Sequence, residues 1–217
     1  MIVKLKAPYA RFTHPLFKSE GLTYPIPTPT SLIGILEAIY WKPQMQYKIH
    51  RIKIMNPIAE IPFSENGIIF TAGMDQIAID ERIGKDMVRT QRRGSMLKDV
   101  CYLVDFCINA DDDRKHYSIL YKRLRNGSCF KHPYMGIREC GLSYFGEADW
   151  DESPSVQINK DFGFILLTMG FSPVKKGSVM SRDRQSKRWV SVETNPVFFR
   201  AKAIDNVVTV PEVKHDL

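Results

Sequence analysis

Residues 100–127, VCYLVDFCINADDDRKHYSILYKRLRNG, decide the fold class. The first nine alternate large apolar side chains from Val100 to Ile108, the period-two pattern of a strand with one buried face. Asp111 to Asp113 then supply an N-terminal cap and an acidic first turn. Apolar residues at three- and four-residue spacing follow as far as Asn126-Gly127, which predicts a helix that ends at a glycine. A strand followed directly by a helix is half of a split β-α-β arrangement.

The N-terminal part of the chain repeats this order. Met1 to Ala7 alternates as a strand, and Thr28 with Pro29 predicts a helix start, because a capping hydroxyl precedes a proline at the first helical position. Gly34 inside this helix indicates close packing against a neighbouring element, and Pro43 ends it, with Tyr40 in its last turn. The apolar face of the helix consists of Leu32, Ile35, Leu36 and Ile39.

Extended segments fill the remaining places. Tyr47 to Met55 predicts a second strand, Ile68 to Thr71 a short third, and Phe130 to Met135 the closing one. The order β-α-β-β-α-β is that of an α+β, ferredoxin-like (RRM-like) fold, in which an antiparallel sheet carries both helices on one face. No further helix is indicated, so we expect residues 1–148 to form this domain and residues 149–217 a small C-terminal antiparallel β-sheet appendage. Its strands are predicted at residues 162–171, 188–192, 196–200 and 206–210.

The composition is that of a globular chain, with 44% hydrophobic and 25% charged residues among 217. No apolar run approaches the ~20 residues of a membrane helix, and the N-terminus lacks the pattern of a signal peptide, so we expect a soluble, cytoplasmic protein without a membrane partner. No P-loop, dinucleotide fingerprint, HExxH or GxSxG is present, so we expect no cofactor and no metal. Four cysteines without CxxC or zinc-finger spacing predict reduced thiols: Cys101, Cys107, Cys129 and Cys140.

The positive charge is concentrated in three segments. Residues 85–98, 114–125 and 175–188 carry net charges of +4, +5 and +5, which leaves the remaining residues at −7 and the chain at +7. This distribution is typical of a protein that binds a phosphate backbone, although three unrelated solvated segments would give the same count. Glycine and serine predict loops in the first and third segments. The candidate RNA-binding residues are Arg89, Arg92, Arg93, Arg114, Lys122, Arg123, Lys175, Lys176, Arg182 and Arg184.

Lys115 and His116 lie in the first turn of the second predicted helix. The residues expected to form its apolar face, Tyr117, Leu120, Tyr121 and Leu124, leave both side chains free to project outward. An imidazole with a pKa of about 6.5 suits proton transfer near neutrality, although an exposed histidine on a basic helix is more often an ordinary surface residue. RNA needs no metal to be cut: its 2′-OH attacks the adjacent phosphate when a base takes the proton, an acid serves the 5′ oxygen and a cation stabilises the phosphorane.

Several ordered motifs resemble the Cas5 family of CRISPR-associated proteins, type I-C branch. They are YPIPT at 24–28, GILEAIYWKP at 34–43, RKHYSIL at 114–120 and GIREC at 136–140. The resemblance extends over roughly the first two thirds of the chain. It implies a ferredoxin-like domain with a β appendage, and a metal-independent endoribonuclease that cuts CRISPR repeat RNA (pre-crRNA) at the hairpin base. It further implies that the protein stays bound to the crRNA 5′ handle among the other type I-C Cascade subunits.

The same resemblance implies three catalytic residues. His116 would be the acid or base, Lys115 would stabilise the phosphorane, and Tyr40 would orient the 2′-OH or share the proton transfer. Without the resemblance, Tyr40 is better explained as an aromatic residue that packs at a helix end. A non-catalytic subunit that binds crRNA is the alternative function. Non-specific binding of duplex DNA through the basic segments is a secondary activity at most.

Overall fold

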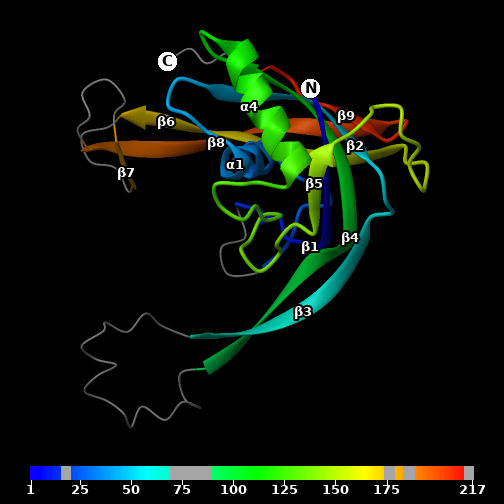
Figure 1. The fold of residues 1–217 in the computed structure, drawn as a ribbon. Helices are drawn as coiled ribbons and strands as arrows, with labels where there is room; N and C mark the ends of the chain where they lie inside the picture. Colours follow the sequence, from blue (N-terminus) through cyan, green and yellow to red (C-terminus); the bar gives the residue numbers. More distant parts are fainter. Residues whose placement is uncertain (16–20, 69–88, 174–178, 183–188, 213–217) are drawn as a thin grey trace.

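In the computed structural model (Figure 1), the strand that opens the deciding stretch is far longer than predicted. This strand, β4, runs over Arg89–Asn109. Its C-terminal half lies between β1 (Ile2–Ala10) and β2 (Gln46–Ile54), and its N-terminal half pairs with β3 (Ala59–Ile68). The structure describes residues 1–15, 21–68, 89–173, 179–182 and 189–212. The predicted inner face of β4 is confirmed as buried: Val100, Tyr102, Val104, Phe106 and Ile108.

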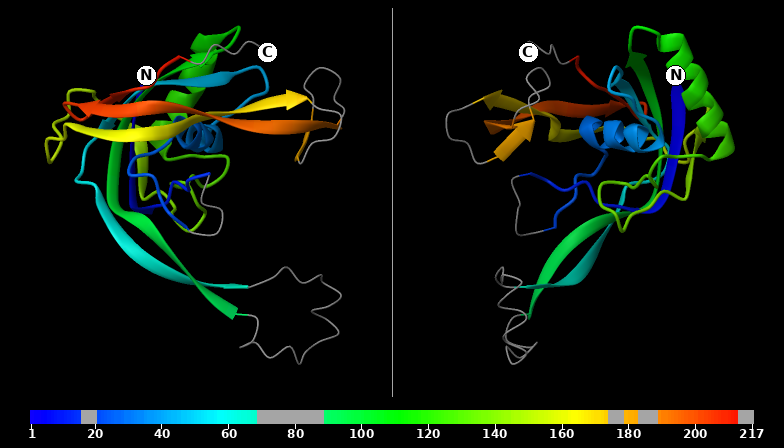
Figure 2. Two further views of the ribbon diagram at one scale, coloured as in Figure 1. Left: turned by 180° about the vertical axis from the view of Figure 1, so that it is seen from behind. Right: turned by 60° about the vertical axis from the view of Figure 1, so that its left-hand side comes forward.

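Residues 89–98 of the first basic segment lie in a strand and not in the predicted loop, and residues 85–88 lie outside the described residues. Arg92 and Arg93 lie in β4 opposite Glu65 and Ser64 of β3, and the β3–β4 hairpin curves away from the rest of the sheet (Figures 1 and 2). We call residues 59–68 and 89–98 the hairpin arm. Gly94 was the misleading signal: a Cβ there would lie 2.7 Å from the Gly21 carbonyl oxygen, so this glycine permits close approach of another segment within a strand.

The predicted closing strand is also wrong. Residues 130–135 form no strand, and the short strand that pairs with β1 is β5 (Tyr144–Glu147). The reason lies in backbone hydrogen bonding: the N–H groups of Phe130 and Lys131 donate to the carbonyl oxygen of Ala38, at 3.0 and 2.9 Å, and not to a neighbouring strand. Of the short strand predicted at 68–71, Ile68 ends β3 and the other positions lie outside the described residues.

The C-terminal strands continue the same antiparallel sheet. They are β6 (Lys160–Pro173), β7 (Val179–Arg182), β8 (Trp189–Ile204) and β9 (Val207–Thr209). The strand order is β5-β1-β4-β2-β9-β8-β6, with β3 beside β4 and β7 beside β8. The fold is therefore mixed α/β, with a mostly antiparallel sheet and few helices.

Both predicted helices are confirmed, together with their N-terminal caps and the Gly127 end of the second. Helix α1 spans Pro29–Ile39, and its N-cap Thr28 accepts a hydrogen bond from the Ser31 N–H at 3.2 Å. Helix α4 spans Asp113–Asn126 between Asp112, whose carboxylate accepts from the Lys115 N–H, and the left-handed Gly127. Their inner faces join β1, β2 and β4 in one core. No helix in the described part of the chain is long and apolar enough to cross a membrane.

Gly34 does not mark the close packing that its place in the helix predicts. It lies on the exposed side of α1, and no atom comes within 4 Å of the position that a Cβ would occupy. The space beside α1 at this point is therefore open, and it forms part of the groove described below.

The turn between β8 and β9 attaches the C-terminal strands to β2. Asp205 and Asn206 have φ angles of 49° and 68°, two consecutive left-handed residues as in the type I′ turns that suit tight hairpins. The buried Asn206 amide donates to the carbonyl oxygens of Ile54 and Val156 and accepts from the Ile158 N–H, at 2.8, 2.7 and 2.9 Å. One side chain thus ties together three segments that are distant in the sequence.

Candidate active site

Tyr40 lies where α1 ends. Its N–H still donates to the Leu36 carbonyl at 2.8 Å, but its own backbone is extended, with φ −153° and ψ 129°. Tyr40 is therefore the C-cap of α1 and not part of its last turn as predicted. Its carbonyl oxygen accepts a hydrogen bond from the Tyr47 hydroxyl at 2.6 Å. Burial, together with the nearby Tyr40 phenol and Glu37, raises the pKa of Tyr47, which keeps that hydroxyl protonated as a donor.

The Tyr40 hydroxyl lies 2.8 Å from Nδ1 of His116, within a hydrogen bond that is buried from solvent. Only 3% of Tyr40 and 4% of His116 is exposed. The prediction that His116 projects outward is therefore wrong. The buried face of α4 consists of His116, Leu120 and Leu124, whereas Tyr121 is exposed, so the helix is rotated from the orientation that its apolar residues predicted.

Arg123 contacts the same tyrosine from two turns further along α4. Its guanidinium carbon lies 5.2 Å from the centroid of the Tyr40 ring, and its Nη1 donates to the Ile39 carbonyl at 2.6 Å. His116 and Arg123 are seven residues apart on α4, so Tyr40 lies against two helical turns of one face. Arg123, a predicted RNA contact, is half-buried and also joins the end of α1 to α4.

Tyr40 lies in the wall of an open groove of about 620 Å³ along the C-terminal half of α1. The charged side chains in its lining are those of Lys42, Arg123 and Lys131, with the carboxylate of Glu37 as the acidic exception. The groove therefore favours an anionic ligand. The other lining residues are Ser31, Gly34, Ile35, Ala38, Trp41, Phe130, His132, Tyr134 and Gly136.

Lys115 does not line this groove. Its N–H donates to the Asp112 carboxylate at 3.3 Å, and its side chain is exposed on the first turn of α4. Neighbouring residues on a helix point about 100° apart, so burial of His116 turns Lys115 outward. The structure thus brings Tyr40 and His116 together and leaves Lys115 on the adjacent helix surface.

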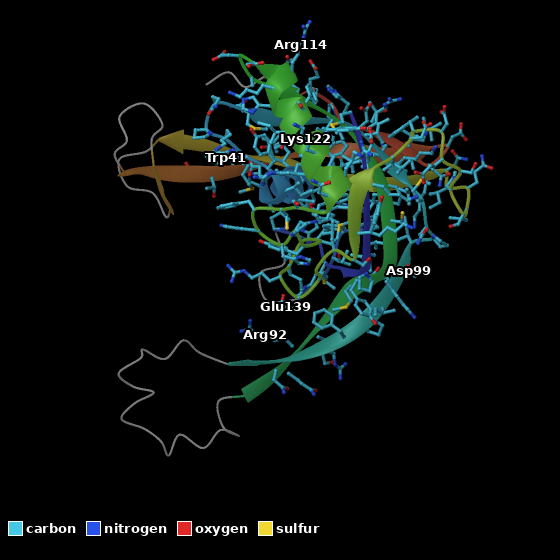
Figure 3. The ribbon with its side chains drawn as sticks, viewed as in Figure 1. Trp41, Arg92, Asp99, Arg114, Lys122 and Glu139 are labelled. Atoms are coloured by element: carbon cyan, nitrogen blue, oxygen red, sulfur yellow. The ribbon has the colours of Figure 1, made fainter. Side chains whose placement is uncertain are left out.

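The predicted RNA contacts are spread over the molecule. Arg114 and Lys122 are exposed on α4, whereas Arg92 lies on the hairpin arm, well apart from them (Figure 3). Arg93 is exposed on the same arm. Arg89 lies in β4 and Arg182 lies in β7, and the side chains of these two residues are not described. Lys175, Lys176 and Arg184 lie outside the described residues.

Several residues of the groove lining are absent from the sites predicted from the sequence: Trp41, Phe130, Lys131, His132 and Tyr134. The available signal was the alternation of aromatic and basic residues just after α1 and again at Phe130-Lys131-His132. The composition of that second run favours a strand, and local sequence carries no sign of its position beside Tyr40.

The sheet face opposite the helices is covered where RNA-recognition modules would bind RNA. Trp150 packs against a small cluster of Met55, Cys101 and Leu103 on that face. Arg51 stacks on the Trp150 ring at 4.3 Å, and Lys53 donates to the Trp150 carbonyl at 2.7 Å. The groove along α1, and not this sheet face, is therefore the accessible candidate site.

The Asp111–Asp113 run serves as the predicted helix cap, through Asp112. Within the described ranges, no group of three or more His, Cys, Asp or Glu residues is arranged to hold a metal ion. All four cysteines are free thiols, as predicted. Burial raises the pKa of the Cys101 and Cys140 thiols.

Together, the fold and the groove define a mixed α/β protein with a basic, aromatic-lined site suited to a nucleic acid. The chain belongs to the CRISPR-associated protein (Cas_Cas5) family, whose Cas5d model matches residues 1–211. The predicted family resemblance is thereby confirmed.

Two curated relatives are similar over nearly the whole chain. The CRISPR pre-crRNA endoribonuclease Cas5d of Thermus thermophilus is 31% identical, with 98% of this chain and 92% of the relative covered. The protein of the same name from Mannheimia succiniciproducens is 29% identical, with 94% and 91% covered.

Two solved structures share the fold. A functionally uncharacterized protein from Streptococcus mutans, SMU1763c, superposes with a TM-score of 0.62 at 18% identity, over 97% of this chain and 91% of that one. The crystal structure of a CRISPR-associated protein gives a TM-score of 0.62 at 20% identity, over 100% and 94%.

Proposed function

We propose that this protein is a metal-independent endoribonuclease that cleaves pre-crRNA at the base of the CRISPR repeat hairpin. Both curated relatives are named as pre-crRNA endoribonucleases. The observation that carries the proposal for this chain is the Tyr40–His116 hydrogen bond of 2.8 Å in the wall of a basic groove. It places an imidazole nitrogen within hydrogen-bond distance of the phenol of a residue that lines the candidate RNA site.

In the proposed reaction the substrate 2′-OH attacks the adjacent phosphorus, and the bond from phosphorus to the 5′ oxygen breaks. Tyr40 takes the 2′-OH proton as its own proton passes to Nδ1 of His116, so the phenol stays neutral. A phenol with a pKa near 10 is a weak base on its own, and this relay supplies the help it needs. The products are a 2′,3′-cyclic phosphate and a 5′-OH.

Lys115 completes the proposed site as the cation that stabilises the phosphorane and protonates the leaving 5′ oxygen. Because its ammonium group lies on the first turn of α4, the RNA must extend from the groove along that helix. Arg114 lies exposed beside it and would contact the phosphate backbone there.

Single substitutions tested on repeat RNA in EDTA check this site. Tyr40→Phe, His116→Ala and Lys115→Ala should each lower the cleavage rate, by about 10²- to 10⁴-fold for a group that transfers a proton. Tyr121→Phe, on the exposed side of α4, is the matched control and should cleave normally. Normal cleavage by all three variants contradicts the site, and a strict requirement for a divalent metal contradicts the mechanism.

The burial of Tyr40 and His116 favours one alternative, a crRNA-binding subunit without catalytic activity in which this hydrogen bond only holds α1 to α4. A 2′-deoxy nucleotide at the cut distinguishes the two functions. The nuclease loses cleavage and keeps binding, whereas for a purely binding subunit the intact repeat and the deoxy repeat both stay uncut.

We further propose that the protein remains with its product as a subunit of a type I-C Cascade complex in the cytoplasm. The arginines of the hairpin arm would give this complex a weak, non-specific affinity for duplex DNA. We also infer a ferredoxin-like domain over residues 1–148 and a β appendage over 149–217. The order β5-β1-β4-β2, with α1 after β1 and α4 after β4, supports that assignment.

A further inference from the structure

Two large apolar rings stand exposed at the groove. Trp41, next to Tyr40, is 49% exposed, and Phe130 is 74% exposed. Both line the groove that contains Tyr40. Exposed apolar rings gathered at one concave site indicate a ligand, whereas single exposed residues elsewhere on a surface need no explanation.

The main chain beneath Phe130 is anchored while its ring is left in solvent. The Phe130 N–H donates to the carbonyl oxygens of Ala38 and Ile39, at 3.0 and 3.3 Å, and the Lys131 N–H donates to Ala38. These bonds satisfy the last carbonyls of α1, which otherwise lack helical partners. The ring is therefore presented from a fixed backbone at the end of the same helix that positions Tyr40.

Cations accompany the rings. The Lys131 ammonium lies 5.7 Å from the centroid of the Phe130 ring, and Lys42 follows Trp41 directly. Aromatic rings that stack bases, next to cations that pair with phosphates, are how proteins hold single-stranded nucleic acid. A duplex offers no free base faces to such rings, so the chemistry fits unpaired nucleotides.

We propose that Trp41 and Phe130 form a base-stacking platform for unpaired nucleotides beside the scissile phosphate. The proposal rests on the proposed function for the identity of the RNA. By stacking the flanking bases, the platform holds the backbone against the groove wall, where Tyr40 meets the 2′-OH. The open space over Gly34 leaves room for the nucleotide on the surface of α1.

The test measures binding of repeat RNA that carries 2′-deoxyribose at the hairpin base, so that cleavage does not interfere. Trp41→Ala and Phe130→Ala should each weaken binding about 5- to 150-fold, since stacking contributes about 1–3 kcal/mol per base. Trp41→Phe should restore most of the affinity. Phe164→Ala is the matched control, because Phe164 is 70% exposed on β6 and lies outside the groove lining.

Abasic nucleotides, introduced one at a time beside the hairpin, identify the stacked bases. Removal of a stacked base should weaken binding to the normal protein but cause no further loss in the variant that lacks its ring. Full additivity of the two changes at every position overturns the platform, as does unchanged binding by both alanine variants. The platform is also overturned if the Trp41→Ala and Phe130→Ala variants bind RNA normally but no longer bind another protein subunit.

Cleavage of unmodified RNA separates this inference from the proposed function. If the wild-type protein cuts the RNA and both alanine variants bind and cut it equally well, the platform is overturned while the endoribonuclease stands. A wild-type protein that binds through both rings without cutting supports the platform and overturns the endoribonuclease. Thermal melts of each variant confirm that it is folded.

Discussion

At the scale of single residues, the Tyr40–His116 hydrogen bond joins positions 76 residues apart. Both groups are almost fully buried, and a buried donor or acceptor that loses its partner keeps the cost of its desolvation. The bond therefore contributes to folding as well as to the proposed chemistry, and the two contributions are measurable separately.

Tyr40→Phe should lower the free energy of unfolding by about 1–2 kcal/mol, because it leaves Nδ1 of His116 buried without its partner. Urea denaturation measures this change. Tyr121→Phe alters an exposed ring and should stay within about 0.5 kcal/mol of the unsubstituted protein. Equal stability of the two variants would show that the bond is not formed in solution.

Thiol reactivity is a second test at this scale. Because burial raises the pKa of Cys101 and Cys140, a smaller fraction of each is thiolate at pH 8 than for an unperturbed thiol. Brief alkylation of the folded protein should modify the half-buried Cys107 and Cys129 first. Peptide mass spectrometry reads the order, and equal labelling of all four would contradict the structure.

The position of His116 shows a limit of sequence analysis. Hydropathy ranked Tyr117 and Tyr121 above His116 as inner residues of α4, yet the imidazole is buried because the Tyr40 hydroxyl satisfies it. The hydropathy pattern of α4 cannot reveal a hydrogen-bond partner that lies 76 residues away in the sequence. The family resemblance singles out His116 as a candidate, whereas no feature of the sequence predicts its buried environment.

At the scale of elements, α1 and α4 were predictable because caps and spacing are local. Thr28, Asp112 and Gly127 all act as caps where the sequence predicted helix ends. The hairpin arm was not predictable, because its strands pair through the backbone, and Gly94 with two arginines resembles a loop. Tertiary contacts likewise placed Phe130 at the end of α1 and not in a strand.

The β8–β9 turn gives a prediction for an element. Asn206→Ala removes three hydrogen bonds, one of them fully buried, and replaces an asparagine, which tolerates the left-handed conformation, by an alanine, which disfavours it. The substitution should therefore destabilise the protein by roughly 3 kcal/mol. Asn206→Gly relieves the backbone cost alone. If the glycine variant unfolds at the urea concentration of the unsubstituted protein, the side-chain bonds contribute nothing.

At the scale of the whole molecule, the excess of +7 is distributed over distant surfaces. Arg92 and Arg93 lie on the hairpin arm, whereas Arg114 and Lys122 lie on α4, well apart from the arm (Figure 3). An RNA that contacts both regions must extend across the molecule. Its binding should then release counterions from both regions at once.

The salt dependence of RNA binding tests that extended path. Replacement of Arg92 and Arg93 together by alanine should reduce the slope of log K against log salt by about 1.4, since each phosphate contact to a single strand contributes about 0.7. Arg200→Ala, which alters an arginine paired with Asp161 on the C-terminal strands, should leave the slope unchanged. An unchanged slope in the double variant would exclude the arm from the RNA path.

Gly34 has a consequence for protein engineering. A glycine inside a helix is about 1 kcal/mol less favourable than alanine, and nothing in the fold occupies the space that a methyl group would take. Alanine there would raise the melting temperature and at the same time fill part of the surface on which the nucleotide is proposed to lie. Thermal tolerance and substrate fit are thus opposed at this one position, so a more heat-resistant variant should be selected by its turnover of RNA and not by its melting temperature alone.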